Sequence, residues 1–270
     1  MKRGVAAAKI NLALVVGPRR RDGKHELLTV YQRIAFADRV EVRPSERNEV
    51  TGFADDTLVV RALDGLTASD DVRLAVRIDK RIPVAAGLGG GSADAAAALA
   101  LGNELLTNPL PHERLDALAR ELGSDVPFFL RAGPQLGAAD GSELRPLDLP
   151  QDYWVLLVVP DGVQKSSTAD VYAHFDARGG EDGFRNRSSA LLTALGRVRR
   201  PRDLAALPPN DLASSPVADE LRGLGAFRAD VSGAGPAVYG LFLHRAVAVE
   251  AQRRMRGRGQ TWLTAPAWYV

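Results

Sequence analysis

Apolar and polar residues alternate along several segments of the chain, which is the pattern of strands that bury one face. In segment 9–16 every second residue, from Ile10 to Val16, is apolar, whereas Lys9 and Asn11 lie side by side on the opposite face. Alternating or continuous apolar residues predict further strands at 39–43, 72–78, 154–159, 238–243 and 262–263. The segment 9–16 is therefore predicted to carry a polar pair on one face, and the alternative is an edge strand whose lysine is solvated.

Apolar residues at helical spacing predict several helices between these strands. The predicted helices lie at 57–63, 92–106, 115–122, 190–198, 218–224 and 246–256. Turn-forming residues predict a turn at 17–23, a loop at 133–146 and a mobile, charged surface segment at 178–187. Because strands and helices mix without regular βαβ alternation or an internal repeat, the pattern favours an α+β fold with two subdomains, the first of which ends in the 133–146 loop.

The stretch Pro83–Ala98 combines a glycine-rich turn with an alanine-rich helix, directly after the strand at 72–78. Strand, glycine turn and helix together direct backbone N–H groups and the positive end of a helix dipole at one point, where a phosphate binds well. Gly91 precedes Ser92, so the stretch lacks both the Lys of a Walker loop and the third Gly of a dinucleotide fingerprint. It therefore predicts phosphate binding in a different fold, and the alternative is a flexible turn before a buried helix.

The composition narrows the class of protein. The chain has 270 residues, 46% of them hydrophobic, which is enough for a sizeable core, and it has no apolar run of membrane-spanning length. It contains no Cys, and its four His residues do not have metal-ligand spacing. The net charge is only +2, so the short arginine runs at 19–21 and 253–256 indicate solvated faces more than nucleic-acid binding. Without a cleavable signal peptide, the chain is predicted to be a soluble cytoplasmic protein.

Two charged residues in apolar surroundings are candidates for chemistry. Lysine occurs at only five positions, 2, 9, 24, 80 and 165, which makes a lysine in a patterned strand such as Lys9 notable. Asp125 follows the helix stop at Gly123 and precedes the apolar residues Val126–Leu130. This places a carboxylate in apolar surroundings. The alternative for Asp125 is an ordinary helix N-cap or turn residue.

Five segments, taken in order and spacing, resemble the GHMP kinases, and within them the 4-diphosphocytidyl-2-C-methyl-D-erythritol kinases of non-mevalonate isoprenoid biosynthesis. The segments are Ala8–Leu12, Arg21–Leu27, Pro83–Ala97, Leu122–Phe129 and Ser232–Pro236. The glycine loop points to the superfamily, whereas Arg21–Leu27 and Leu122–Phe129 point to this particular kinase. The resemblance covers residues from about 6 to 243.

The resemblance implies a two-domain fold and a reaction. It implies an ATP-binding domain like ribosomal protein S5 at residues 1–147 and a ferredoxin-like domain at 148–270. ATP, with Mg²⁺ bridging its phosphates, would phosphorylate the 2-hydroxyl of 4-diphosphocytidyl-2-C-methyl-D-erythritol. The expected partner is this small molecule, with no nucleic acid or membrane, and the expected state is a cytoplasmic monomer or weak homodimer.

The resemblance also assigns residues to roles. The implied catalytic pair is Lys9 and Asp125. The implied ATP-binding residues are Thr57, Pro83, Val84, Ala85, Ala86, Gly87, Leu88, Gly89, Gly90, Gly91, Ser92 and Ala93. The implied substrate-binding residues are Asn11, Lys24, His25, Thr168, Tyr172, Gly233 and Gly235. No residue is assigned to a metal.

The chain departs from the family pattern at a few positions. Ala7 replaces a Pro, Thr57 replaces an Asn near the adenine, and Lys24 replaces a Tyr expected to face the cytosine. The alternatives are another GHMP small-molecule kinase, for homoserine or a mevalonate derivative, and a non-catalytic binder of phosphate or nucleic acid with the same fold. His25 in the segment Arg21–Leu27 argues against another kinase.

Overall fold

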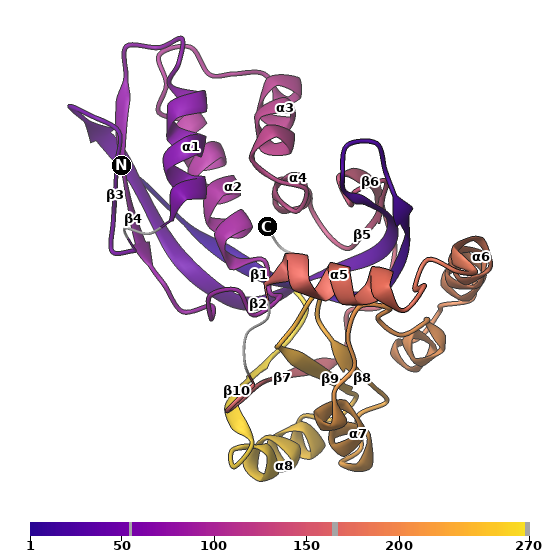
Figure 1. Cartoon of the computed structure of the whole chain (residues 1–270). Coiled ribbons are helices and arrows are strands. Elements are labelled where there is room, and N and C mark those ends of the chain that lie inside the picture. The colour runs from indigo at the N-terminus through magenta and orange to yellow at the C-terminus, as the bar shows by residue number, and fades with distance from the viewer. Residues whose placement is uncertain (54–55, 164–166, 268–270) are drawn as a thin grey trace. The chain divides into compact units, whose positions relative to one another are not determined.

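The computed structural model describes residues 1–53, 56–163 and 167–267, which form two compact units (Figure 1). The first unit comprises Met1–Ala8, Ala37–Val84 and Gly89–Ala132. The second comprises Lys9–Phe36, Ala85–Leu88 and the chain from Gly133 onward. These units interleave along the sequence, whereas the predicted domains 1–147 and 148–270 are consecutive, so that domain division stays a prediction.

The strands of the first unit form where the alternating pattern predicts them. Strand β2 (His25–Ser45) pairs through residues 39–45 with the antiparallel strand β4 (Arg73–Asp79), and β3 (Glu49–Thr51) pairs with β4 in parallel. The apolar residues on alternate positions of β2 and β4 are buried. The predictions at 39–43 and 72–78 are therefore confirmed. Strand β1 (Lys2–Arg19) pairs with β2 and, like it, contributes residues to both units.

Four helices belong to the first unit: α1 (Thr57–Leu66), α2 (Gly90–Asn103), α3 (His112–Leu122) and α4 (Val126–Phe129). Helices α1 and α2 pack against each other (Figure 1). Asp56 caps α1 by accepting a hydrogen bond from the Val59 N–H, which explains the predicted helix start at residue 57. Helix α2 begins two residues before the predicted start at 92 and ends three residues before the predicted end at 106. At its end, the Asn103 side chain bonds the backbone of Leu110.

Two stretches predicted as turn or loop are partly strand. Strand β1 continues through Gly17 to Arg19, and β5 (Gln135–Ala138) and β6 (Glu143–Pro146) form a hairpin within the predicted loop 133–146. The loop prediction at 133–146 is wrong because β5 pairs with residues 29–31 of β2, and pairing with an existing strand overrides weak local propensity. A glycine is needed at position 17 because a Cβ there would lie 2.7 Å from the Phe184 ring.

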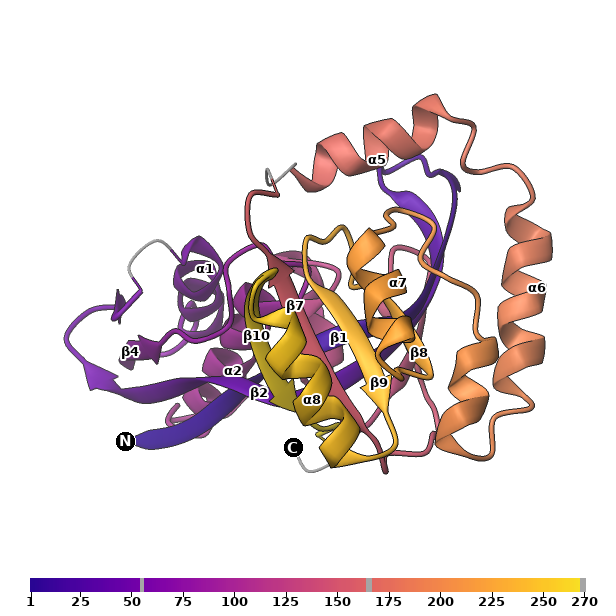
Figure 2. The same cartoon turned by 90° about the horizontal axis from the view of Figure 1, so that it is seen from below.

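The second unit contains a four-stranded antiparallel sheet in the order β10-β7-β9-β8. Its strands are β7 (Trp154–Pro160), β8 (Arg228–Val231), β9 (Val238–Phe242) and β10 (Gly259–Thr264). Helices α7 (Pro216–Gly223) and α8 (Arg245–Met255) pack on this sheet and bury an apolar cluster with it (Figure 2). Apart from the helices inserted between β7 and α7, the order β7-α7-β8-β9-α8-β10 is the ferredoxin-like arrangement, which confirms that expectation.

The remaining helices of the second unit are α5 (Thr168–Ala177), α6 (Phe184–Leu195) and the 3₁₀ helix η1 (Pro201–Ala206). The segment 178–187, predicted to be mobile, is tied down by the Arg187 guanidinium. It donates hydrogen bonds to the carbonyls of Val16 and Gly180 and pairs with Asp211 at 3.0 Å. The several donors of Arg187, together with a hydrogen bond from Arg178 to the Asp211 carbonyl, therefore fix this charged segment. Within the described residues, no helix is both long and apolar enough to cross a membrane.

Candidate active site

The glycine loop has the backbone geometry predicted for an anion cradle. Gly89, the N-cap residue of α2, has a left-handed φ of 70°, and Gly87 has a φ of 83°. The N–H groups in the first turn of a helix have no carbonyl partner within it and point toward the positive end of the dipole. In the first unit lie Pro83, Val84, Gly89, Gly90, Gly91, Ser92 and Ala93, and in the second lie Ala85, Ala86, Gly87 and Leu88. The loop can therefore hold a phosphate at the start of α2.

A buried group of charges lies beneath this helix start. The Lys80 ammonium pairs with Asp38 at 2.8 Å and with Asp94 at 2.5 Å. Asp38 also accepts backbone hydrogen bonds from Arg81 and Ile82, the residues that enter the loop. A Cβ on Gly90 would lie 3.0 Å from the Lys80 Nζ. Lys80 and its two carboxylates thus fix the base of the loop. None of the three was assigned from the sequence, because only packing brings them together.

The titration of these groups reflects their burial. Burial raises the pKa of Asp94 to about 7, against the opposing effect of the Lys80 ammonium. Burial also raises the pKa of Asp56, the capping residue of α1. Burial by itself would lower the pKa of Lys80. The neighbouring carboxylates of Asp94 and Asp38 outweigh this effect and raise the pKa, so this lysine stays charged. One ammonium therefore faces several carboxyl groups close to the start of α2.

Lys9 and Asn11 form a buried polar pair on β1. Their exposed fractions are 4% and 3%, so the alternative of an edge strand with a solvated lysine is wrong. The Lys9 Nζ donates to the Asn11 Oδ1 at 2.7 Å, and the Asn11 Nδ2 donates to the Thr29 Oγ1 at 2.8 Å. Thr29 in turn donates to the Ala13 carbonyl. This chain of hydrogen bonds fixes the position of the ammonium, because a buried charge needs partners.

A second glycine turn lies against this pair. A Cβ built on Gly233 would lie 3.4 Å from the Asn11 Oδ1 and 3.5 Å from the Lys9 Nζ. Both Gly233 and Gly235 have positive φ, 57° and 77°. The Lys9 N–H donates to the Leu88 carbonyl at 3.0 Å, so the glycine loop also reaches the lysine. Within the second unit, the structure thus brings together predicted residues from three distant segments of the chain.

Asp125 lies in the first unit, between α3 and α4. Gly123 ends α3, as predicted, with its N–H bonded to the Ala119 carbonyl. Within the described residues, Asp125 occupies the N-cap position of α4, but its carboxylate makes no capping hydrogen bond. Asp125 therefore stands at the N-cap position of α4 without the side-chain hydrogen bond that usually defines a cap. The pairing of Asp125 with Lys9 in catalysis remains a prediction.

The residues predicted to bind the cytidine part belong to the second unit. The His25 ring stacks on Tyr172 with 4.7 Å between the ring centroids, and its Nε2 lies 2.7 Å from the Asp176 Oδ1. The half-exposed Lys24 pairs with Asp140 at 2.5 Å. Thr168 is the exposed first residue of α5, and in the first unit Thr57 is the exposed first residue of α1. His25 thus stacks on Tyr172, and Lys24 forms an ion pair with the Asp140 carboxylate.

The structure adds residues that were not assigned from the sequence. Thr29 supports Asn11, the Tyr31 ring lies 5.7 Å from the Lys9 Nζ, and Ser232 bonds the Gly87 carbonyl at 2.9 Å. Asn210 bonds the Gly233 carbonyl. Ser232 lies in a segment that carried the resemblance, so that segment was a signal. Thr29, Tyr31 and Asn210 carried no comparable signal, because only pairing in space brings them to the site.

Comparison with known proteins agrees with this geometry. Residues 57–133 match the GHMP kinases N terminal domain, and residues 209–261 match the GHMP kinases C terminal domain. A 4-diphosphocytidyl-2-C-methyl-D-erythritol kinase from Anaeromyxobacter sp. (strain Fw109-5) is 38% identical, covering 92% of this chain and 85% of the relative. One from Geobacter sulfurreducens is 35% identical, covering 96% of each chain.

A solved structure is similar over nearly the whole chain. The crystal structure of a 4-(cytidine 5'-diphospho)-2C-methyl-D-erythritol kinase superposes with a TM-score of 0.80 and 31% sequence identity, covering 98% of this chain and 99% of the other. A crystal structure of mevalonate kinase, at 13% identity and a TM-score of 0.75, shares the fold. The chain therefore belongs to the GHMP kinases, and within them to the family of 4-diphosphocytidyl-2-C-methyl-D-erythritol kinases.

Proposed function

We propose that this chain transfers a phosphoryl group from ATP to the 2-hydroxyl of 4-diphosphocytidyl-2-C-methyl-D-erythritol. The observation that carries the proposal is the buried Lys9–Asn11 pair, held beside both glycine turns on the buried part of β1. A buried, hydrogen-bonded lysine next to a phosphate-type loop suits phosphoryl transfer, which depends mainly on positioning and charge stabilisation. The relatives at 35% and 38% identity support the choice of substrate.

The glycine loop fits the phosphates of ATP. Gly87 and Gly89 have left-handed φ values, which disfavour any residue with a side chain, and a Cβ on Gly90 would crowd Lys80. Because the loop is bare of side chains here, a bulky anion can approach its backbone. The N-terminus of α2 supplies N–H groups and the positive dipole end. We assign the stretch Pro83–Ala93 to the phosphates and Thr57 to the neighbourhood of the adenine.

Lys9 and Asp125 have complementary roles in this proposal. Asp125 accepts the proton of the attacking 2-hydroxyl, since a positioned carboxylate is a suitable general base. Lys9 stabilises the negative charge that grows on the transferred group, since a preorganised ammonium in a water-poor site acts strongly. Asn11 holds the Lys9 ammonium in place through the bond of 2.7 Å.

Mg²⁺ belongs to the proposal as a companion of ATP. When bound to the phosphates, the ion neutralises part of their charge. Among the described residues there is no cluster of three or more acidic, Cys or His side chains with metal-site geometry. The donor set at the loop, glycines with backbone N–H groups and Ser92, fits a nucleotide that brings its own metal better than a dedicated metal site.

Recognition of the cytidine part is proposed for the His25–Tyr172 pair. The Asp176 carboxylate, 2.7 Å from the His25 Nε2, orients the imidazole. Aromatic rings stack on a base with about 1–3 kcal/mol per base. Lys24 contributes through its ammonium or its methylene stem, and Thr168, Gly233 and Gly235 complete the proposed substrate site. We also propose that the protein acts in the cytoplasm as a monomer or weak homodimer.

A coupled kinase assay tests the proposal. ADP release is measured with ATP and Mg²⁺, with and without the cytidine substrate, and with homoserine and mevalonate as competing alcohols. The proposal expects turnover with the cytidine substrate alone. Turnover only with another alcohol would replace it by another GHMP kinase. Absence of turnover, together with salt-sensitive RNA binding, would replace it by a nucleic-acid binder.

A further inference from the structure

Asn210 lies beside β1, the strand that carries Lys9 and Asn11. It forms a parallel bridge with Leu14, and the next residue, Asp211, donates its N–H to the Leu14 carbonyl at 2.9 Å. The Asp211 carboxylate accepts the Val16 N–H at 2.9 Å. Asn210 and Asp211 therefore act as a short additional strand that fixes the course of β1 beyond the Lys9–Asn11 pair.

The Asn210 side chain reaches the second glycine turn. Its Nδ2 donates to the Gly233 carbonyl at 2.6 Å and to the Val231 carbonyl at 3.0 Å. Its Oδ1 accepts the Leu212 N–H at 2.8 Å. One buried amide thus uses both donors and its acceptor to connect the segment along β1 with the turn that lies against Lys9.

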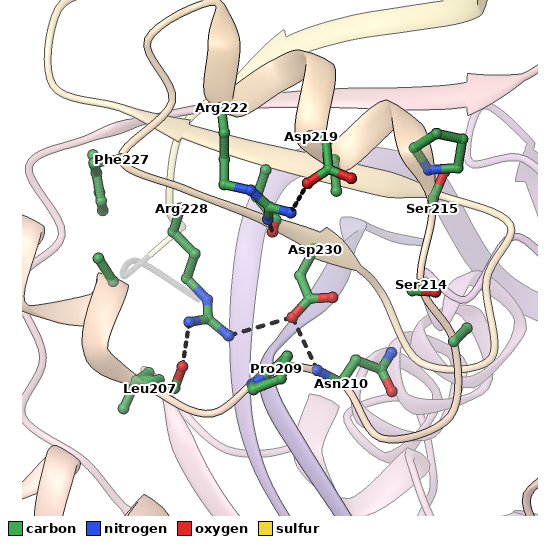
Figure 3. Close-up of a pocket in the computed structure, with 15 residues that line it drawn as sticks. Leu207, Pro209, Asn210, Ser214, Ser215, Asp219, Arg222, Phe227, Arg228 and Asp230 are labelled. Atoms are coloured by element: carbon green, nitrogen blue, oxygen red, sulfur yellow. Dashed lines mark hydrogen bonds and ion pairs between the residues drawn. The ribbon is translucent and has the colours of Figure 1, made fainter.

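Buried charges hold the Asn210 backbone in place. The Asn210 N–H donates to the Asp230 Oδ2 at 2.9 Å, and Arg228 lies 3.4 Å from the same oxygen (Figure 3). Arg228 also donates to the Tyr239 hydroxyl, which in turn donates to the Leu12 carbonyl of β1 at 3.3 Å. Asn210, Arg228 and Asp230 line a pocket of about 440 Å³. Through Tyr239, the hydrogen bonds run from the four-stranded sheet to β1. A satisfied buried network of this kind is rigid.

We propose that Asn210 is a positioning residue for phosphoryl transfer, which sets the Ser232–Gly235 turn against the Lys9 ammonium. This inference rests on the proposed function of Lys9. Asn210 acts through Gly233, where a built Cβ would lie 3.5 Å from the Lys9 Nζ and 3.4 Å from the Asn11 Oδ1. Because catalysis depends on placing charges to within a fraction of an ångström, a shift of the turn lowers kcat more than it weakens ATP binding.

The substitution Asn210→Asp isolates this role. Aspartate has nearly the same shape, but it replaces two donors by an acceptor that faces the carbonyls of Val231 and Gly233. The matched control is Asn103→Asp, because the Asn103 side chain also bonds a backbone N–H and a carbonyl, both of Leu110, in the first unit. Both variants are assayed well below their thermal midpoints, with kcat and KM determined separately for ATP and for the cytidine substrate.

The expected result is a loss in kcat of about tenfold or more in Asn210→Asp, with a KM for ATP within about threefold of the wild type. Asn103→Asp is expected to keep kcat within about threefold while losing some thermal stability. Equal kcat values in the wild type and a folded Asn210→Asp variant would overturn the inference. If Asn210→Asp does not fold, Asn210→Ala, which removes the amide without adding charge, is measured in the same way.

Lysine NMR provides a readout that does not depend on turnover. The chain has five lysines, so ¹³C,¹⁵N-lysine labelling gives five side-chain signals, assigned by substituting each lysine in turn. In Asn210→Asp the Lys9 side-chain signal is expected to move, and in Asn103→Asp it is expected to stay. An unmoved Lys9 signal overturns the inference even if kcat falls. If the wild type does not phosphorylate the cytidine substrate, the proposed function fails, and the Lys9 signal alone decides the role of Asn210.

Discussion

Gly87 and Ser232 are in direct contact, and this contact joins the two glycine turns of the second unit. The Ser232 Oγ donates to the Gly87 carbonyl at 2.9 Å, and a Cβ built on Gly87 would lie 2.1 Å from the Ser232 carbonyl oxygen. The Ala237 N–H also donates to the neighbouring Ala86 carbonyl at 3.0 Å. Since backbone atoms meet backbone atoms, no side-chain rearrangement relieves a substitution at Gly87.

We therefore expect Gly87→Ala to be much more destabilising than Gly23→Ala. Both glycines have a φ of 83°, but nothing lies within 4 Å of a Cβ at Gly23. The left-handed backbone alone costs about 1–2 kcal/mol for a non-glycine residue, and the contact with Ser232 adds to this at Gly87. Urea unfolding of both variants measures the difference. Equal losses would show that the two turns separate readily.

Lys9→Met is expected to lower kcat by about a hundredfold or more while changing the KM for the cytidine substrate much less. The methionine keeps the apolar stem but removes the ammonium that Asn11 holds at 2.7 Å. Lys2→Met on the same strand is the control, because Lys2 is half-exposed and pairs with Glu104. Steady-state kinetics with both substrates decide the question. A rise in KM at unchanged kcat would make Lys9 a binding residue.

Asp125→Asn is expected to lower kcat by about a hundredfold or more and to leave ATP affinity close to the wild-type value. The amide keeps the size of the carboxylate but cannot accept the proton of the attacking hydroxyl. The control is Asp64→Asn on α1, where an exposed carboxylate accepts a hydrogen bond from Asn48. Turnover and nucleotide titration are measured together. More than about a tenth of the wild-type kcat in Asp125→Asn would refute the base role.

The stability of the protein is expected to fall as the pH rises from about 4 to about 7, in part because of Asp94. Burial raises its pKa from the usual 3.8 to about 7, so in this range the folded state holds a proton that the unfolded state has released. The free energy of unfolding then decreases with pH. Asp94→Asn has no such proton, and its stability should depend less on pH between pH 5 and pH 7.

Urea unfolding at several pH values measures these slopes. Glu250→Gln is the control, because hydrogen bonds from Arg253 and Arg254 lower the pKa of Glu250 to about 2, below the range compared. It should therefore keep the wild-type slope between pH 5 and pH 7. The same slope in Asp94→Asn as in the wild type would mean that Asp94 holds no proton there.

Lys24→Ala is expected to weaken binding of the cytidine substrate several-fold at low salt and less at high salt. The Asp140 carboxylate, 2.5 Å from the half-exposed Lys24 ammonium, competes with a diphosphate for this charge, and salt screens both contacts. Asp140→Asn removes the competing charge and should tighten binding at low salt. Titrations of both variants at two salt concentrations measure this. Unchanged affinity throughout would show that Lys24 does not meet the substrate.

The sequence by itself determined the features that depend on local geometry. The cluster of glycines at 87–91, followed by a run of helix formers, predicted the phosphate-type loop and a helix that starts close to residue 90, as α2 does. The alternation in segment 9–16 placed Lys9 and Asn11 on one face, and Gly123 marked the end of α3. These signals are readable because strand periodicity, helix propensity and the left-handed backbone of glycine act over a few residues.

Only the tertiary structure decided which distant residues meet. Pairing with β2 turned part of 133–146 into strand β5, and the ring of Phe184 fixed Gly17 within β1. The Lys80 charges and the Asn210 amide gained their roles in the same way. Their sequence neighbourhoods carry no sign of this, because a hydrogen bond between residues far apart in the chain depends on how whole elements pack, and packing is a property of the folded chain as a unit.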